Sequence, residues 1–392
     1  MNSKILSKEV QDYIEANLQA DVAKIALSKP LFDGVSSAEL AAQIAAKKKS
    51  AQKLPTWYKT DNIYYPALLS IEQCSSEHTA AYKAGLALGD TLIDITSGFG
   101  VDSLFFSKRM KKVTSCELNP ELSSIAAHNA KKFGMDNIEC KAGDGIEILK
   151  ANDTNFDTLY IDPARRSGSN KVFKLNDCTP DVTNHLNLFL KKAKRVIIKS
   201  APLLDISVGI SELKNIKEIH VVSVKNECKE LIWVIDEGFI GDTKVVCITL
   251  NDIEKTFSFY LNELQVAANI SNETPNGYLY EPDVALLKSG AFNLISQRFD
   301  LKKLHLHSHL YFSNELKSNF PGRVFEIQTV TTPNKLGKEK SLQGNVIVRN
   351  FPEKAENLVK KYKIKPTHDD FIIFTQNENG NLVIIGKIIQ HY

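Results

Sequence analysis

Apolar residues recur at helical spacing through the first 90 positions of the chain. One such set consists of Val10, Tyr13, Ile14 and Leu18. This spacing predicts a helix with one buried face. A second helix is predicted from Ser37 into the lysine run 47–49, and a third from about residue 75 to residue 88. We therefore expect residues 1–89 to form an N-terminal helical segment.

An aromatic cluster interrupts this helical pattern. Its members are Trp57, Tyr58, Tyr64 and Tyr65. Aromatic side chains of this kind can form a platform on which nucleic-acid bases stack. More often they pack a helical segment against its neighbour, because each ring buries a large apolar surface. We expect core packing for this cluster.

From about residue 90, short apolar runs alternate with helical stretches. The runs lie at 91–95, 112–117, 137–140, 158–162, 195–199, 219–224 and 231–235. Strands that alternate with helices form a parallel sheet whose two faces are covered by the helices. The last two runs are joined by a short charged link, which predicts an antiparallel hairpin at the sheet edge. The fold class we expect for 90–240 is therefore α/β, with a seven-stranded sheet.

The order of elements changes again after about residue 274. A helix is predicted over 283–296 and a strand over 322–327. The remaining elements are a strand at 346–349, a helix at 354–362 and two strands that end near 389. We expect a linker and a small α+β unit of ferredoxin-like form at 241–328, followed by a separate C-terminal domain at 329–392.

The composition is that of a globular protein. The 392 residues are 43% apolar and 24% charged, which excludes wholesale disorder, collagen and coiled coil. A net charge of +3 excludes a polybasic coat protein, although sixteen Lys and Arg against eleven Asp and Glu follow residue 274. No apolar stretch reaches the ~18 residues that span a bilayer. Since the N-terminus also turns polar at once, we expect a cytoplasmic protein with no membrane partner.

Neither the cysteines nor the histidines are spaced as metal ligands. The six cysteines are Cys74, Cys116, Cys140, Cys178, Cys228 and Cys247. None forms a C-x-x-C pair, so we expect reduced thiols and no metal. His305, His307 and His309 alternate as on one face of a strand. No carboxylate or cysteine joins them at useful spacing, so a half-buried strand is the preferred interpretation.

The strongest chemical signal is the stretch from Asp94 to Asp102, which reads D-I-T-S-G-F-G-V-D. A buried strand ends in Asp94, and two glycines then open a helix. Gly98 and Gly100 allow the backbone to approach a ligand closely. A dinucleotide loop would carry a third glycine, and an acidic residue here would repel a pyrophosphate. We therefore expect a ligand without phosphates, and we expect Asp102 to cap its helix.

Three more polar groups follow later strands. Glu117 ends the second strand, where an acidic residue fits a bidentate hydrogen bond to ribose hydroxyls. Asp144 lies in a Gly-Asp-Gly loop after the third strand, and its carboxylate could accept from an exocyclic amine. Asp162 follows the fourth strand and precedes Arg165 and Arg166. The two guanidinium groups suit a phosphate or carboxylate of a substrate, or are solvated loop charges.

These four points, in this order, resemble the class I S-adenosylmethionine-dependent methyltransferases over residues 65–240. The resemblance implies a Rossmann-like sheet and the cofactor S-adenosylmethionine, with S-adenosylhomocysteine as product. The implied cofactor-binding residues are Asp94, Thr96, Ser97, Gly98, Gly100, Glu117, Leu118, Asp144 and Gln73. For Gln73, helix capping is the alternative role. The implied catalytic residues are Asp162 and Arg165.

The substrate is expected from a second resemblance. The loop form D-x-T-x-G-x-G-x-D is similar to that of a bacterial 16S rRNA guanine-N2 methyltransferase, and the wider chain resembles a bacterial group with a THUMP-like C-terminal domain. Because THUMP domains bind tRNA, the resemblance implies methylation of a tRNA or rRNA base. The alternatives are a protein or small metabolite as acceptor, or an RNA-binding module without catalysis.

The motif after the fourth strand narrows the chemistry. Amino methyltransferases often carry an aromatic residue at the fourth place of this motif, where Arg165 stands here. A pyrimidine-C5 mechanism needs a cysteine nucleophile, which the segments 162–164 and 199–202 lack. The motif therefore leaves the methylated atom open.

Overall fold

The computed structural model describes residues 1–165, 174–336 and 342–392. The chain divides into two compact units. The first contains residues Met1–Lys217 and Ile232–Ile240, and the second contains Glu218–Leu231 and Gly241–Tyr392. Among the described residues, no helix combines the length and apolar character needed to cross a bilayer. Arg166 lies outside the described residues, as does the side chain of Arg165.

The N-terminal part of the first unit is helical, as its periodicity predicts. Its α-helices are α1 (Lys8–Ala16), α2 (Val22–Ala26), α3 (Ser37–Lys53), α4 (Pro55–Lys59), α5 (Leu68–Gln73) and α6 (Glu77–Ala84). Helix α3 begins with a capping box, in which Ser36 and Glu39 exchange side-chain and backbone hydrogen bonds. The helix begins at Ser37 as predicted, but its N-cap is Ser36, and Glu39 is the third residue after that cap.

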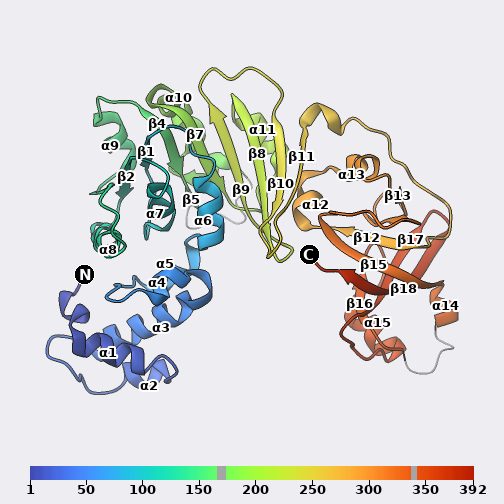
Figure 1. Cartoon of the computed structure of the whole chain (residues 1–392), viewed down its shortest axis with the longest axis horizontal. Coiled ribbons are helices and arrows are strands. Elements are labelled where there is room, and N and C mark those ends of the chain that lie inside the picture. Colours follow the sequence, from blue (N-terminus) through green and yellow to red (C-terminus); the bar gives the residue numbers. More distant parts are fainter. Residues whose placement is uncertain (166–173, 337–341) are drawn as a thin grey trace. The chain divides into compact units, whose positions relative to one another are not determined.

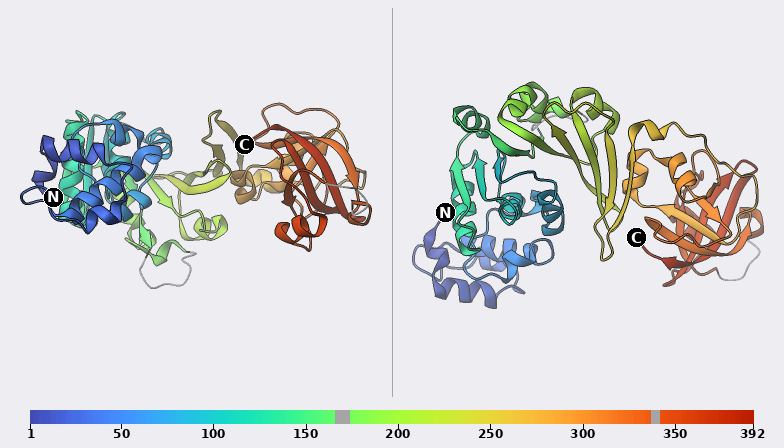
Figure 2. Two further views of the ribbon diagram at one scale, coloured as in Figure 1. Left: turned by 90° about the horizontal axis from the view of Figure 1, so that it is seen from below. Right: turned by 45° about the horizontal axis from the view of Figure 1, so that its top comes forward.

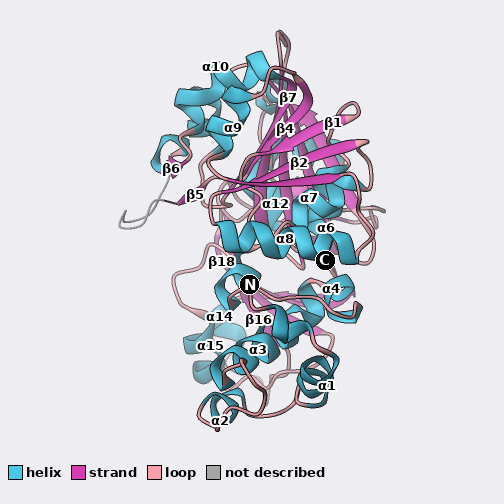
Figure 3. Cartoon of the chain, turned by 90° about the vertical axis from the view of Figure 1, so that its left-hand side faces the viewer, coloured by secondary structure: helices cyan, strands magenta, loops and turns pink. Residues whose placement is uncertain are grey.

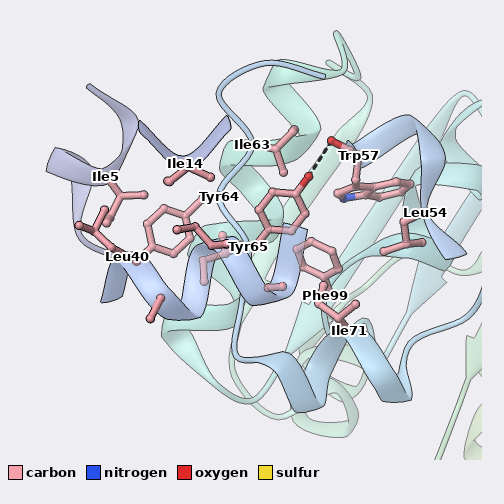
Figure 4. Close-up of a cluster of buried hydrophobic side chains, with 14 of the residues drawn as sticks. Ile5, Ile14, Leu40, Leu54, Trp57, Ile63, Tyr64, Tyr65, Ile71 and Phe99 are labelled. Atoms are coloured by element: carbon pink, nitrogen blue, oxygen red, sulfur yellow. Dashed lines mark hydrogen bonds between the residues drawn. The ribbon is translucent and has the colours of Figure 1, made fainter. Parts of the chain in front are cut away.

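The aromatic cluster packs these helices against the sheet that follows. Trp57, Tyr64 and Tyr65 are buried beside Phe99 in one apolar cluster, drawn in Figure 4. The Tyr65 hydroxyl donates to the Trp57 carbonyl over 2.9 Å. Buried rings cannot stack on an external base, so the core-packing prediction is confirmed for these three rings.

The first sheet is the α/β core that the alternating pattern predicts, with nine strands instead of seven. Its strands are β1 (Thr91–Asp94), β2 (Lys112–Glu117), β3 (Ile138–Ala142), β4 (Phe156–Ile161), β7 (Ala193–Ser200), β8 (Ile216–Val224), β9 (Glu227–Asp236), β10 (Lys244–Thr249) and β11 (Lys255–Tyr260). They follow the order β11-β10-β8-β9-β7-β4-β1-β2-β3. The hairpin β8–β9 is therefore not at the edge, because β10 and β11 continue the sheet beyond β8.

Helices cover both faces of this sheet. They are α7 (Val101–Ser107), α8 (Pro120–Lys132), α9 (Gly145–Ala151), α10 (Val182–Lys192) and α11 (Ile206–Glu212). Figure 3 shows α9 and α10 on one side of the strands, and α7 and α8 on the other. A separate short ribbon pairs β5 (Ala164–Arg165) with β6 (Cys178–Thr179). All neighbours among β3, β2, β1, β4 and β7 pair in parallel.

The second unit contains a seven-stranded sheet in the order β13-β14-β12-β15-β18-β17-β16. Figures 1 and 2 draw the strands of this sheet in orange to red. Its strands are β12 (Tyr278–Pro282), β13 (Lys302–Lys303), β14 (Tyr311–Ser313), β15 (Gly322–Thr331), β16 (Asn345–Val348), β17 (Asp370–Asn377) and β18 (Gly380–Gln390). Its helices are α12 (Val284–Ser289), α13 (Phe292–Arg298), α14 (Pro333–Leu336) and α15 (Ala355–Tyr362). This is the smaller α+β region that the sequence predicts.

Two predictions for this region are wrong in detail. The helix expected over 283–296 is two helices, because Gly290 adopts a left-handed conformation with φ of 76° and ends α12. The residues His305, His307 and His309 lie in and beside a turn, not on a strand. The alternation of these histidines therefore does not reflect a β-strand, and the prediction of a half-buried strand is wrong.

Candidate active site

The carboxyl ends of four strands meet at one edge of the first sheet. Strand β1 pairs in parallel with β2 on one side and with β4 on the other, and β4 pairs with β7. The chain runs outward from β1 through β2 and β3, then returns to the other side of β1 with β4. This is the reversal at which open α/β sheets bind ligands, just outside the carboxyl ends of their strands. Asp94, Glu117 and Asp162 end or follow three of these strands.

Asp94 closes β1 with a fully buried side chain. Its Oδ1 accepts from the Thr96 amide over 3.1 Å, and its Oδ2 accepts from the Ser103 hydroxyl over 2.6 Å. Burial raises the pKa of Asp94 to about 8, although both hydrogen bonds act in the opposite direction. The carboxyl thus ties the first turn of the loop to α7.

The loop after Asp94 leaves open space beside one glycine. Gly98 and Gly100 have φ values of 55° and 83°, which residues other than glycine rarely adopt. A Cβ on Gly100 would lie 3.1 Å from the Cβ of Ala126, so α8 packs against it. A Cβ on Gly98 would meet nothing within 4 Å. Beside it, the buried Ser97 hydroxyl has no hydrogen-bond partner among the described residues.

Glu117 joins the loop after β2 to the glycine loop. Its Oε2 accepts from the Gly98 amide over 2.9 Å, and its Oε1 accepts from the Asn119 amide over 2.8 Å. Each carboxylate oxygen keeps a second lone pair that can accept another hydrogen bond. The next residue, Leu118, exposes 71% of its surface. The pair presents an acceptor beside an apolar side chain, which suits a ribose joined to a flat base.

The positions of Asp144 and Gln73 say less about a role in cofactor binding. Asp144 caps α9 by accepting from the Ile146 amide over 2.8 Å. Gln73 is the exposed last residue of α5 and does not cap α6, which is capped by Ser76. The capping alternative for Gln73 is therefore wrong, and its cofactor role stays a prediction.

Asp162 is connected to two neighbouring strands. Its backbone amide donates to the Thr96 hydroxyl over 2.7 Å. Its Oδ2 accepts from the ammonium of Lys199 in β7 over 2.6 Å. Lys199 was not among the expected site residues, although a lysine directly after the apolar run of a strand was an available signal. Arg165 belongs to the short strand β5, and its side chain, like all of Arg166, falls in the part of the chain that is not described.

Asp102 forms a buried ion pair and does not cap α7. Lys83, whose side chain is fully buried, places its ammonium 3.1 Å from Asp102 Oδ1. The hydroxyls of Ser75 and Tyr160 both donate to Asp102 Oδ2, over 2.8 and 2.9 Å. Burial acts to raise the pKa of Asp102, but the charges of Lys83 and Lys199 outweigh it and hold that pKa below its usual value. Asp102 is therefore an ionised residue beneath the site.

Family models match three successive stretches of the chain. The model described as RNA cap guanine-N2 methyltransferase matches residues 89–263. A ferredoxin-like domain model matches residues 278–321, and a THUMP domain-like model matches residues 322–387. The THUMP-like resemblance of the C-terminal region is thereby confirmed. In the residues that the structure describes, no group of three His, Cys, Asp or Glu side chains is arranged to hold a metal ion.

Individual relatives agree with the model that matches the core. A Methanobrevibacter smithii protein named as a cobalt-precorrin-6B C(15)-methyltransferase (decarboxylating) is 30% identical over 177 residues, 43% of this chain and 85% of that protein. An uncharacterised RNA methyltransferase of Mycoplasma mobile is 34% identical over 88 residues, so the match spans 22% of this chain but only 24% of that protein. The crystal structure of a methyltransferase candidate from Porphyromonas gingivalis W83 is 27% identical, with a TM-score of 0.88 and 99% of both chains covered.

The class of the protein follows from two observations. Carboxylates line the carboxyl ends of the strands of this sheet, and the relatives are methyltransferases. The chain belongs to the S-adenosylmethionine-dependent methyltransferases. The residues at the edge fit that cofactor. Gly98 leaves space beside the loop, and the buried Ser97 hydroxyl lacks a partner among the described residues. The Glu117 carboxylate suits a ligand that carries hydroxyl groups.

Proposed function

We propose that this methyltransferase methylates a base of tRNA or rRNA. The observation that carries the proposal is the presence, on one chain, of a methyltransferase core and a THUMP domain-like stretch. THUMP domains bind tRNA, and relatives of the core from several bacteria are named as RNA methyltransferases. The excess of Lys and Arg after residue 274 supports phosphate contacts by that region. Such an enzyme acts in the cytoplasm, where its substrate is made.

The proposed cofactor contacts follow from the positions of the side chains. Glu117 accepts hydrogen bonds from the ribose hydroxyls, and Leu118 and Asp144 lie at the adenine. The loop residues Thr96, Ser97, Gly98 and Gly100, together with Gln73, hold the methionine part, and Asp94 contributes by fixing the loop from beneath. The bound cofactor supplies a methyl group activated by its sulfonium. The protein has to align the acceptor with that methyl group.

Asp162 is the proposed catalytic residue. It follows β4, next to the glycine loop, and among the described residues none donates to its Oδ1. That oxygen can accept a hydrogen bond from an amine of an extruded base and orient it or take its proton. Arg165 is proposed to hold a phosphate of the substrate.

We further propose four parts in the chain. They are the helical segment 1–89, the cofactor-binding core 90–240, a linker and ferredoxin-like unit 241–328, and the THUMP-like domain 329–392. In this arrangement the core carries the chemistry and the last two parts bind RNA.

A small metabolite is the second candidate acceptor. The observation that favours it is the relative named as a cobalt-precorrin methyltransferase, which this chain covers to 85%. That relative is shorter, since the match takes up only 43% of this chain. The remainder of this chain includes residues that a metabolite enzyme of that size does not have.

Transfer of radioactive methyl from S-adenosylmethionine separates these candidates. The full chain is incubated with unmodified total RNA, with a protein fraction or with a metabolite fraction. Label in one RNA species is the expected result. Label confined to the metabolite or the protein fraction would contradict the RNA proposal and leave the class of the enzyme unchanged.

A further inference from the structure

Lys199 and Asp162 lie side by side because of the sheet register. Strands β4 and β7 pair in parallel, with Ile161 opposite Ile198. The next residues are Asp162, which follows β4, and Lys199 of β7, so both lie at the carboxyl ends of these strands. Their ammonium and carboxylate groups are 2.6 Å apart. The side chains retain only 31% and 17% exposure, so solvent screens the pair less than an ion pair on the surface.

The contact uses one oxygen of Asp162 and fixes the direction of the other. Oδ2 accepts from Lys199, and the backbone amide of the same residue donates to Thr96. These two bonds hold the residue from β7 and from the glycine loop. Among the described residues Oδ1 accepts no hydrogen bond. The geometry therefore leaves one oriented oxygen for a ligand group.

Lys199 is held in this position by more than Asp162. Its charge helps to hold the pKa of Asp102 below the usual value, together with that of Lys83. Asp102 is anchored in turn by Tyr160 of β4 and by Ser75. Lys199 thus interacts with two carboxylates, Asp162 and Asp102.

We propose that Lys199 is a positioning residue for methyl transfer, which aims Asp162 Oδ1 at the acceptor. This inference rests on the proposed function, because Asp162 is the acceptor-side residue there. Lys199 acts through Asp162 and needs no contact with the substrate or the cofactor. Its loss should therefore affect the catalytic step and leave cofactor binding intact.

The test compares Lys199→Met, Lys199→Arg, Asp162→Asn and the double variant Lys199→Met with Asp162→Asn. Methionine keeps the length of the side chain and removes the charge, whereas arginine keeps the charge. We expect Lys199→Met to lower kcat at least about tenfold, with the dissociation constant of S-adenosylmethionine changed less than about twofold. Arginine should restore part of kcat. In the Asp162→Asn background Lys199→Met should have no further effect, since both changes remove one interaction.

Two kinetic or binding results would overturn the inference. One is a Lys199→Met effect that multiplies with that of Asp162→Asn, and the other is a loss of cofactor affinity that accounts for the lower rate. Lysine-ammonium NMR provides a readout that needs no acceptor. The Lys199 signal, assigned by its absence in Lys199→Arg, should be slow to exchange in the wild type and should shift or vanish in Asp162→Asn. An unchanged signal would overturn the positioning role. Failure of the wild type to label RNA would instead count against the proposed function.

Discussion

The carboxylates at the strand edge differ in what surrounds them, and this separates their roles. Asp94 and Asp102 are buried among protein groups, whereas Glu117 and Asp162 keep lone pairs toward the edge. Buried carboxyls shape the loop, and accessible ones are available to ligands. Sequence spacing placed Asp94, Glu117 and Asp162 at strand ends and Asp102 at the start of a helix, but it did not separate the two kinds of carboxylate.

Glu117→Gln should weaken cofactor binding. A charge-assisted hydrogen bond contributes about 1.5–3 kcal/mol, which corresponds to roughly 10- to 150-fold in the dissociation constant of S-adenosylmethionine. Isothermal titration calorimetry measures this constant directly. Glu147→Gln is the matched control, because Glu147 is an exposed residue of α9 whose carboxylate pairs with Lys150. Equal affinity in the two variants would remove Glu117 from the cofactor site.

The raised pKa of Asp94 predicts a pH dependence of stability. The unfolded pKa is near 3.8 and the folded one is about 8. Between these values the folded state holds the additional proton, so the contribution to stability is full below pH 4 and is lost as pH rises to 8. The slope approaches about 1.4 kcal/mol per pH unit. Urea unfolding should show the free energy of unfolding of the wild type falling steadily relative to that of Asp94→Asn as pH rises across this range. A difference that does not vary with pH would contradict the assignment.

Lys83→Met should destabilise the first unit. It leaves the Asp102 carboxylate buried without its partner, which costs about 3–5 kcal/mol. The double variant Lys83→Met with Asp102→Asn removes both charges and should recover much of this loss. Thermal unfolding of the three proteins measures both effects. A double variant that is less stable than Lys83→Met alone would show that the pair is not the source of the loss.

At the scale of elements, the glycine loop combines a backbone conformation that favours glycine with open space for a ligand beside Gly98. Gly98→Ala should cost about 1–2 kcal/mol of stability, because φ of 55° is unfavourable for alanine. Its methyl group would also enter the space beside the loop, so we expect cofactor affinity to fall more than tenfold. Gly134→Ala is the control, since Gly134 has φ of 70°, equally open surroundings and a place at the end of α8. Similar affinity losses in both variants would contradict the loop assignment.

Most elements of the core were predictable, since each strand is a short apolar run between polar ones. The missed strands β10 and β11 also carry such a signal: Val245 to Ile248 are apolar, and 255–260 alternates. Both fall within 241–328, which was expected to be a linker and a small α+β unit. The ion pair between Lys83 and Asp102 could not be predicted, because Lys83 lies in α6, 19 positions before Asp102, and the two meet only in the fold.

At the scale of the whole molecule, the proposed function predicts how RNA binding responds to salt. Each phosphate contact that a Lys or Arg makes releases counterions, so the affinity falls linearly with the logarithm of salt concentration. We expect a slope that corresponds to several contacts when unmodified tRNA is titrated at increasing potassium chloride. Reversal of charge at exposed lysines of α15, such as Lys360→Glu, should reduce the slope by about one. A salt-independent affinity would argue for a small-metabolite acceptor.

The most direct measurement combines cofactor binding and methyl transfer to RNA in the wild type and in Asp162→Asn. Both proteins receive the same labelled S-adenosylmethionine and the same unmodified total RNA. The account predicts that the wild type labels one RNA species. The variant should have an initial rate lower by at least about 100-fold, and the two proteins should have nearly equal dissociation constants for the cofactor. The account would be contradicted if the wild type transferred no label to RNA, or if the variant lost cofactor affinity and kept its rate.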